Sequence, residues 1–177
     1  MLFISIDPGR VNTCIVVAYA DSECQFVSID SVFIVETSGL NSTGAEKLLE
    51  VLHVYYQTLD AVIIVEDQVA AIRGKSNLNI VYNNFVQAII VGYFIETHLL
   101  VESSPNNSLR YLTQNHRVLP TDDKTIMATR LVDQLEAIWS DKVALFVKQH
   151  PSSVPHVMDC IAQMIFEILV NRIFDQV

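Results

Sequence analysis

The sequence predicts an α/β fold in which a mixed β-sheet is flanked by helices on both faces. Two patterns predict it: three closely linked apolar or alternating runs open the chain, and helical periodicity then alternates with further short apolar runs. The predicted order βββ-α-β-α-β-α-α is typical of a sheet covered by helices. A chain of 177 residues can bury the core of one domain and is too short for two, so residues 1–177 are expected to form a single domain.

The three opening runs, residues 2–6, 14–20 and 25–35, are predicted to form an antiparallel meander, because the links between them are short. The next predicted element is a helix that opens with the capping-box pattern Thr43-Gly-Ala-Glu46. Its apolar residues recur at helical spacing: Leu48, Leu49, Leu52 and Tyr55 or Tyr56.

Residues 61–65, AVIIV, are wholly apolar and rich in β-branched side chains, which is typical of a strand covered on both faces. This fourth strand ends at Glu66. A right-handed helical crossover from the opening meander makes the first and fourth strands parallel neighbours.

Four further elements complete the prediction. A helix over residues 79–96 carries Val81, Phe85, Ile89 and Tyr93 at helical spacing, and we expect these side chains to pack in the core. A fifth strand covers residues 99–101. A third helix, residues 121–139, has acids in its first turn, and a last helix runs from Pro155 to about residue 174.

Composition narrows the classes of function. The formal net charge of −9 argues against a nucleic-acid partner, because phosphate contacts need Lys and Arg. Three cysteines without metal-like spacing predict an intracellular, reducing compartment. No signal peptide is expected, because Asp7 interrupts the first apolar run, and the apolar residues 85–95 are too few to span a membrane.

Two carboxylates are predicted to meet at one edge of the sheet. Asp7 ends the first strand and Glu66 ends the fourth, and neighbouring strands lie about 4.8 Å apart. Two carboxylates at that separation repel each other unless one is protonated or a cation joins them. Mg²⁺ takes oxygen ligands of this kind.

His156 and Asp159 lie three residues apart at the start of the last helix, and therefore on one helical face. If this helix begins at the same edge of the sheet, a third carboxylate and an imidazole join the first two. One or two divalent ions held there could orient a water and stabilise the leaving oxygen of a phosphodiester.

Each of these positions also has an ordinary structural explanation. Asp before Pro-Gly is common in turns, and Glu66 could be a solvated strand end. Asp159 could cap or pair locally, and His156 could be a polar residue of a first helical turn. The metal interpretation therefore depends on whether the four side chains converge.

Several basic residues fall in predicted loops or at a helix start: Arg10, Arg73, Lys75, Arg110, Arg117 and Lys124. A cationic rim around a metal-bound acidic centre suits a phosphate backbone. The alternative is that these loops are polar only because they are exposed.

Three segments carry a family resemblance: ISIDPGRVN at residues 4–12, VIIVEDQVAAIRG at residues 62–74 and HVMDCIAQ at residues 156–163. Their order and context resemble the RuvC-like Holliday junction resolvases of the ribonuclease H-like superfamily. The stretch Glu66-Asp67-Gln68 with Arg73 behind it is more similar to the mitochondrial and large-DNA-virus branch than to the bacterial one. The resemblance covers nearly the whole chain and implies a ribonuclease H-like, five-stranded mixed sheet.

The resemblance implies a homodimeric, Mg²⁺-dependent endonuclease of DNA recombination and repair, with Mn²⁺ as a substitute ion. It would resolve four-way DNA junctions by paired nicks, wherever that DNA resides, without a small-molecule cofactor or a membrane. By position, the catalytic metal-binding residues would be Asp7, Glu66, His156 and Asp159, and His156 stands where many members have another Asp. Lys124 would contact the scissile phosphate, and DNA contacts would come from Arg10, Arg73, Lys75, Arg110 and Lys124.

Two features depart from the family. Val69, Ala70 and Ala71 replace the aromatic wedge that bacterial members carry after the glutamate, so junction distortion would need other residues, such as Tyr82 or Phe85. The acidic net charge is also unusual for a DNA nuclease. Two alternatives therefore stay open: a ribonuclease H-like nuclease acting on RNA or RNA–DNA hybrids, and a RuvC-like binding module without catalysis. The resemblance also implies the helix over residues 79–96 as a dimer interface.

Overall fold

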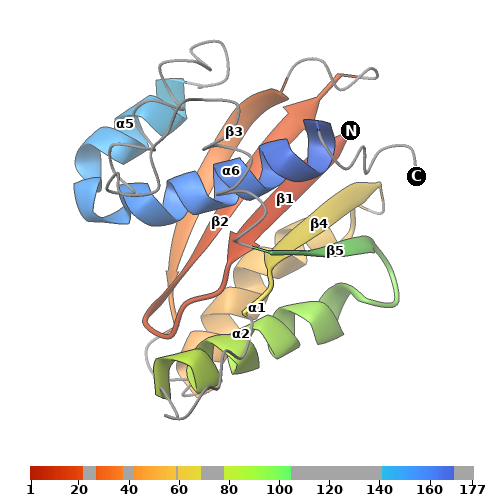
Figure 1. Cartoon of the computed structure of the whole chain (residues 1–177), viewed down its shortest axis with the longest axis vertical. Coiled ribbons are helices and arrows are strands. Elements are labelled where there is room, and N and C mark those ends of the chain that lie inside the picture. The colour runs from red at the N-terminus through yellow and green to blue at the C-terminus, as the bar shows by residue number, and fades with distance from the viewer. Residues whose placement is uncertain (22–26, 38–41, 59, 69–77, 105–140, 170–177) are drawn as a thin grey trace.

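The computed structural model describes residues 1–21, 27–37, 42–58, 60–68, 78–104 and 141–169. Within these residues five strands form one sheet, with helices on both faces (Figure 1), which confirms the predicted fold class. The elements follow in this order: β1 (Leu2–Asp7), β2 (Asn12–Ala20), β3 (Val27–Glu36), α1 (Ser42–Tyr56), β4 (Ala61–Glu66), α2 (Leu78–Phe94), β5 (Leu99–Ser103), α5 (Asp141–Gln149), a 3-10 turn (Pro151–Ser153) and α6 (Val154–Leu169).

The strand order in the sheet is β3-β2-β1-β4-β5, so β1 is central. β2 pairs antiparallel with both β1 and β3, which confirms the predicted meander. β4 pairs parallel with β1, and β5 pairs parallel with β4. The first and fourth strands are therefore parallel neighbours, as predicted, and they end at the same edge of the sheet.

The sheet is the middle layer of the molecule. α6 and α5 cover one face, and α1 and α2 cover the other (Figure 1). Because successive residues of a strand point to opposite faces, Phe3 packs with α6 whereas Ile4 packs with α1 and α2. In β4, Ile64 and Ile63 divide between the two faces in the same way. This double cover explains why the AVIIV run is wholly apolar.

α1 packs on the sheet through Leu48 and Leu52, as its periodicity predicts. The helix begins at Ser42, so Thr43 lies inside its first turn and not at the N-cap position that the capping-box pattern predicts. The first turn lies close to the end of β3, since a Cβ atom on Gly44 would stand 2.5 Å from the carbonyl oxygen of Thr37. Among the described residues, this close approach of Gly44 to Thr37 is a constraint on the start of the helix.

The buried stripe of α2 differs from the predicted one. Val86, Ile90 and Phe94 are fully buried against the sheet, whereas Val81 and Phe85 are more than half exposed. The prediction that Val81 and Phe85 pack in the core is therefore wrong. The physical reason is that α2 is apolar on several sides, so periodicity alone does not select the face that meets the sheet.

α5 was not predicted from the sequence, in which no helix is expected between residues 139 and 155. Phe146 and Val147 of this short helix pack at the edge of the α6 side of the core. The acid at Asp141 in its first turn and Lys148 in its last turn were the available signals. The predicted helix over residues 121–139 lies outside the described residues. None of the described helices is long and apolar enough to cross a membrane.

The two sides of α1 give a matched test of this packing. Leu52 is fully buried and Val54 is 69% exposed. Leu52→Ala is expected to lower the free energy of unfolding by about 2–5 kcal/mol, because it leaves a cavity under the sheet. Val54→Ala is expected to change it by less than about 0.5 kcal/mol. Urea denaturation of both variants measures the difference, and equal losses would contradict the assigned face.

Candidate active site

Asp7 and Glu66 stand side by side at the carboxyl edge of the sheet. Ile6 is paired with Val65 in the parallel register of β1 and β4, so the next residue of each strand is the carboxylate. On the outer sides of this pair, Cys14 of β2 is opposite Asp7 and Ser103 of β5 is opposite Glu66. Partners in register share a face of the sheet, and this row lies on the face that α6 covers.

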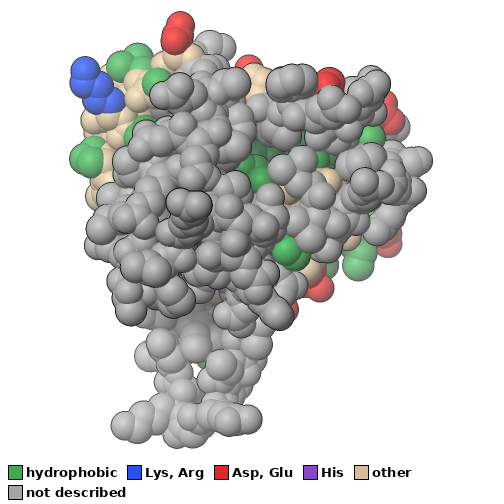
Figure 2. Space-filling view, turned by 45° about the horizontal axis from the view of Figure 1, so that its top comes forward, with side chains coloured by type: hydrophobic (Ala, Val, Ile, Leu, Met, Phe, Trp, Pro, Cys, Tyr) green, Lys and Arg blue, Asp and Glu red, His purple; other side chains and the backbone are tan. Residues whose placement is uncertain are grey.

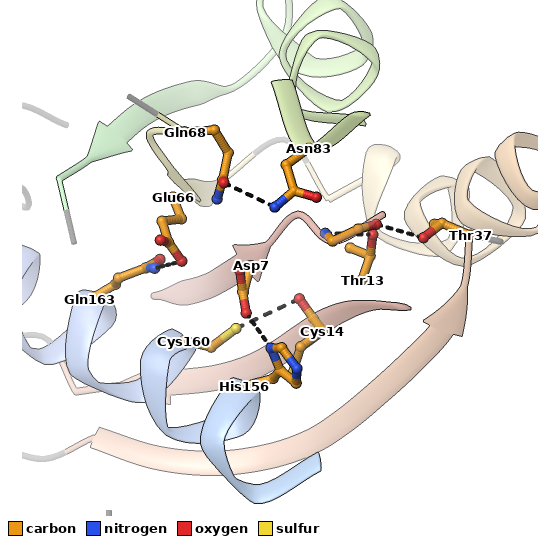
Figure 3. A network of polar contacts seen from close by, with 11 residues as sticks. Asp7, Thr13, Cys14, Thr37, Glu66, Gln68, Asn83, His156, Cys160 and Gln163 are labelled. Atoms are coloured by element: carbon orange, nitrogen blue, oxygen red, sulfur yellow. Dashed lines mark hydrogen bonds and ion pairs between the residues drawn. The ribbon is translucent and has the colours of Figure 1, made fainter. Parts of the chain in front are cut away.

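α6 presents one row of polar and sulfur-containing side chains to the two carboxylates (Figure 3). His156, Asp159, Cys160 and Gln163 are spaced by three, one and three residues and therefore share a helical face. The Nδ1 atom of His156 lies 2.8 Å from Oδ2 of Asp7. Because an ionised carboxylate only accepts hydrogen bonds, this nitrogen is the donor.

The second contact joins Gln163 to Glu66. The amide Nε2 of Gln163 donates to Oε2 of Glu66 at 3.0 Å, and the amide Oε1 accepts from the Ser5 hydroxyl at 3.4 Å. Neither Gln163 nor Ser5 was singled out in the sequence analysis. A glutamine four residues after Asp159, on the same helical face, was the only signal.

The Cys160 thiol lies between these contacts and is fully buried. It donates to the carbonyl oxygen of Cys14 at 3.6 Å. Burial raises the pKa of this thiol well above its ordinary value, and Cys14 and the charges of Asp7 and Asp159 act in the same direction. The thiol therefore stays protonated and is a poor metal ligand.

The structure thus brings Asp7, Glu66 and His156 to one edge of the sheet, with Asp159 on the same helical face as His156, and the contacts there are hydrogen bonds. Among the described residues, no three His, Cys, Asp or Glu side chains form a group that could hold a metal ion. Asp7 is bonded to His156 and Glu66 to Gln163, while Asp159 lies between these two α6 residues in sequence. The role of the four residues as metal ligands stays a prediction.

The donor chemistry of this edge fits a hard divalent cation. Carboxylate oxygens are the ligands that Mg²⁺ prefers, and imidazole is accepted by several divalent ions. The hydroxyl of Ser103, which is in register with Glu66, is buried and has no hydrogen-bond partner in the described part of the chain. A buried polar atom without a partner is unusual in folded proteins, and a bound ion or its water would satisfy it.

The turn that follows Asp7 is held by threonines from two other segments. The Thr37 hydroxyl donates to the carbonyl oxygen of Gly9 at 2.7 Å, and the Gly9 amide donates to the Thr13 hydroxyl at 3.5 Å. A Cβ atom on Gly9 would lie 2.0 Å from the carbonyl oxygen of Asn12. Only glycine fits this close approach, so the Pro-Gly sequence serves to position Asp7.

The end of β4 is held from the α2 side by a set of amides. The backbone amide of Gln68 donates to Oε1 of Gln87 at 3.0 Å, and Asn83 donates to Oε1 of Gln68 at 3.1 Å. Gln87 in turn donates to Glu102 of β5 at 2.7 Å. The signal for these residues was the presence of four amides in a largely apolar helix, Asn79, Asn83, Asn84 and Gln87, of which Asn83 and Gln87 are four positions apart and therefore share a face.

Of the predicted DNA-contacting residues, only Arg10 is described. Its side chain is exposed, and its guanidinium lies 4.9 Å from the ring centroid of Tyr82, which is a cation–π contact. The other four predicted contacts lie outside the described residues: Arg73, Lys75, Arg110 and Lys124.

Positive charge is distributed unevenly along the chain. Seven of the eleven Lys and Arg residues, but only six of the twenty Asp and Glu residues, lie outside the described ranges. Acidic side chains of the described residues appear at several places on the face shown in Figure 2, and basic ones at one corner. The net charge of −9 is therefore concentrated in the described part.

Comparisons with known proteins identify solved structures with a similar fold. No family model and no curated protein sequence matches the chain. The Thermus thermophilus RuvC structure in complex with a Holliday junction substrate has a TM-score of 0.66 at 14% identity, over 98% of this chain and 96% of that one. The yeast mitochondrial Holliday junction resolvase Ydc2 has a TM-score of 0.64 at 14% identity, over 91% and 75%. The fowlpox virus Holliday junction resolvase has a TM-score of 0.61 at 11% identity, over 95% and 97%.

These likenesses define the fold as ribonuclease H-like. More narrowly, it is the form of that fold found in the RuvC-like resolvases of a bacterium, a poxvirus and yeast mitochondria. The resemblance inferred from three short sequence segments is confirmed at the level of the fold.

Two glycines test the turn after Asp7. Gly9→Ala is expected to lower the free energy of unfolding by more than about 1 kcal/mol, because the new methyl group collides with backbone. Gly92→Ala, on α2, would meet nothing within 4 Å in its own chain, and in the monomer it is expected to be neutral or stabilising by about 0.4–1 kcal/mol. Thermal and urea unfolding of both variants provide the comparison. A neutral Gly9→Ala would mean that the turn does not constrain Asp7.

Proposed function

We propose that this protein is a metal-dependent endonuclease that resolves four-way (Holliday) DNA junctions by paired phosphodiester nicks. The observation that carries the proposal is the row formed by Asp7 and Glu66 at the ends of two parallel strands, beneath the α6 face that bears His156 and Asp159. The fold shared with three solved resolvases supports the same reaction class.

The proposed metal ligands are Asp7, Glu66, His156 and Asp159, and the proposed ion is Mg²⁺, with Mn²⁺ as a substitute. When bound, the ion supplies positive charge that activates a water and stabilises the leaving oxygen. The protein's part is to hold two like charges next to each other. Hydrogen bonds from α6 to Asp7 and Glu66 do this by placing a donor on each carboxylate.

Solvent and substrate are proposed to reach this centre from the side of His156. The His156 side chain is 51% exposed, whereas that of Asp7 is 11% exposed. A phosphate group approaching from that side would meet the imidazole first and the carboxylates behind it.

The DNA backbone is proposed to be held by Arg10, Arg73, Lys75, Arg110 and Lys124, with Lys124 at the scissile phosphate. The uneven distribution of charge supports this. The part of the chain that contains four of these residues carries most of the basic side chains. The net charge of the whole chain is therefore a weak objection to a nucleic-acid substrate, because the acidic residues are concentrated in a different part of the chain from most of the proposed DNA contacts.

A homodimer is proposed to form through the exposed side of α2. We call this side the α2 stripe; its members are Val81, Phe85, Ala88 and Gly92, which recur at helical spacing and are all exposed. Val81 is 52% exposed and Phe85 is 57% exposed. Apolar side chains gathered on one exposed helix face are typical of a contact surface. The proposed reaction also favours a dimer, because paired nicks require two active sites.

A binding module without catalysis is the second candidate. It is favoured by the pairing of Asp7 and Glu66 with α6 side chains, since no three-ligand group forms among the described residues. Titration of the whole protein with Mn²⁺ separates the two candidates, because a non-catalytic module without the metal centre would bind no ion saturably.

Removal of one carboxylate tests the proposed reaction. Asp7→Asn is expected to abolish nicking of a four-way junction in Mg²⁺ while junction binding persists, because a ligand charge is lost and the fold is kept. Asp60→Asn removes the same charge at the opposite end of β4 and is expected to cut like the unchanged protein. Gel assays on junctions, duplexes, RNA–DNA hybrids and structured RNA, at one ionic strength, give the readout. Wild-type nicking by Asp7→Asn would refute the assignment, and preference for hybrids or RNA would redirect it.

The α2 stripe is tested by charge insertion. Phe85→Glu is expected to convert a dimer of the 19.9 kDa chain into a monomer, because a buried carboxylate would disfavour the interface. Val54→Glu places the same charge on the exposed side of α1 and is expected to leave the dimer intact. Light scattering after size exclusion measures both masses. An unchanged mass for Phe85→Glu would exclude this surface.

A further inference from the structure

The Gln163 amide connects the two strands that carry the proposed metal-binding carboxylates. Its nitrogen contacts Glu66 at the end of β4, and its oxygen contacts Ser5, two residues before Asp7 in β1. Gln163 is 1% exposed and Ser5 is fully buried, so water has little access to the amide itself. One side chain of α6 therefore bridges β1 and β4 just beneath their acidic ends. Figure 3 shows its contact with Glu66.

The chemistry of the partners determines how this amide is oriented. An ionised carboxylate has no hydrogen to donate, so it requires the NH₂ end of the amide, and the carbonyl end then faces Ser5. The Ser5 hydroxyl can donate, and it does so at 3.4 Å. The orientation is unambiguous, and reversing the amide would place its oxygen against the carboxylate.

We infer that Gln163 is a positioning residue for Glu66, which it holds in the orientation that a divalent cation requires. This inference rests on the proposed function, because it assigns Glu66 to a metal site. Gln163 follows Asp159 by one helical turn, so the helix that supplies the third carboxylate also sets the direction of the second. Hydrogen-bond partners of metal ligands commonly have this role.

The residue that follows Gln163 in α6 provides a control position for this inference. Met164, the next residue, is also fully buried but belongs to the apolar core between α6 and the sheet. It has no part in orienting Glu66. A general loosening of α6 and a specific loss of Glu66 orientation can therefore be distinguished by comparing changes at these two neighbouring positions.

The test is the affinity of the full-length, metal-free protein for Mn²⁺, measured by calorimetry and by electron paramagnetic resonance of free Mn²⁺. Gln163→Met keeps the length of the side chain and removes both hydrogen bonds, and it is expected to weaken Mn²⁺ binding by about 10- to 100-fold. Gln163→Asn withdraws the amide by one methylene and is expected to weaken binding in the same direction, which provides a milder variant if Gln163→Met does not fold. Met164→Ala is expected to melt at a lower temperature and to bind Mn²⁺ with unchanged affinity.

The Mn²⁺ affinities of these variants separate failure of the positioning role from failure of the proposed metal site. If the unchanged protein binds Mn²⁺, Glu66→Gln loses binding and both Gln163 variants keep wild-type affinity, the positioning role is refuted and the proposed metal site stands. Equal weakening by Met164→Ala would also refute it, because the effect would then be a general loss of stability. If the unchanged protein itself binds no Mn²⁺, the proposed function fails first.

Discussion

The structure depends on the packing of α6 across the ends of β1 and β4. These two parallel strands finish in Asp7 and Glu66, and two carboxylates at neighbouring strand ends repel each other. α6 relieves this repulsion by placing a donor on each carboxylate, His156 on one and Gln163 on the other. The arrangement is stable only while the helix keeps its position along the sheet.

The apolar residues of α6 maintain that position. Val157, Ile161 and Ile168 are buried in the core between the helix and the sheet, on the face of the helix beside its polar row. The polar contacts and the hydrophobic core therefore lie on adjoining faces of one helix. A shift of α6 by one residue would move a donor away from each carboxylate and would also disturb the core, so the energetics of packing protect the geometry of the site.

The other side of the sheet supports the same site through different chemistry. α2 is largely apolar, yet Asn83 and Gln87 bind the segment that follows Glu66 and connect it to β5. Glu66 is thus held from α6 through its side chain and from α2 through Gln68, two residues further along the chain. The opposite side of α2 keeps its apolar residues exposed, which leaves this helix available for a partner while its amides support the end of β4.

The sequence by itself determined the meander, the parallel pairing of β1 and β4, and the meeting of Asp7 with Glu66, because apolar runs and chain order allow few sheet topologies. It did not determine which apolar stripe of α2 is buried. The stripe that contains Phe85 and the stripe that contains Phe94 lie on different sides of the helix, and both recur at helical spacing. Only the tertiary structure showed that Gln163 reaches both Ser5 and Glu66. Contacts between residues so distant along the chain follow from where a helix packs on a sheet, and no local pattern encodes that placement.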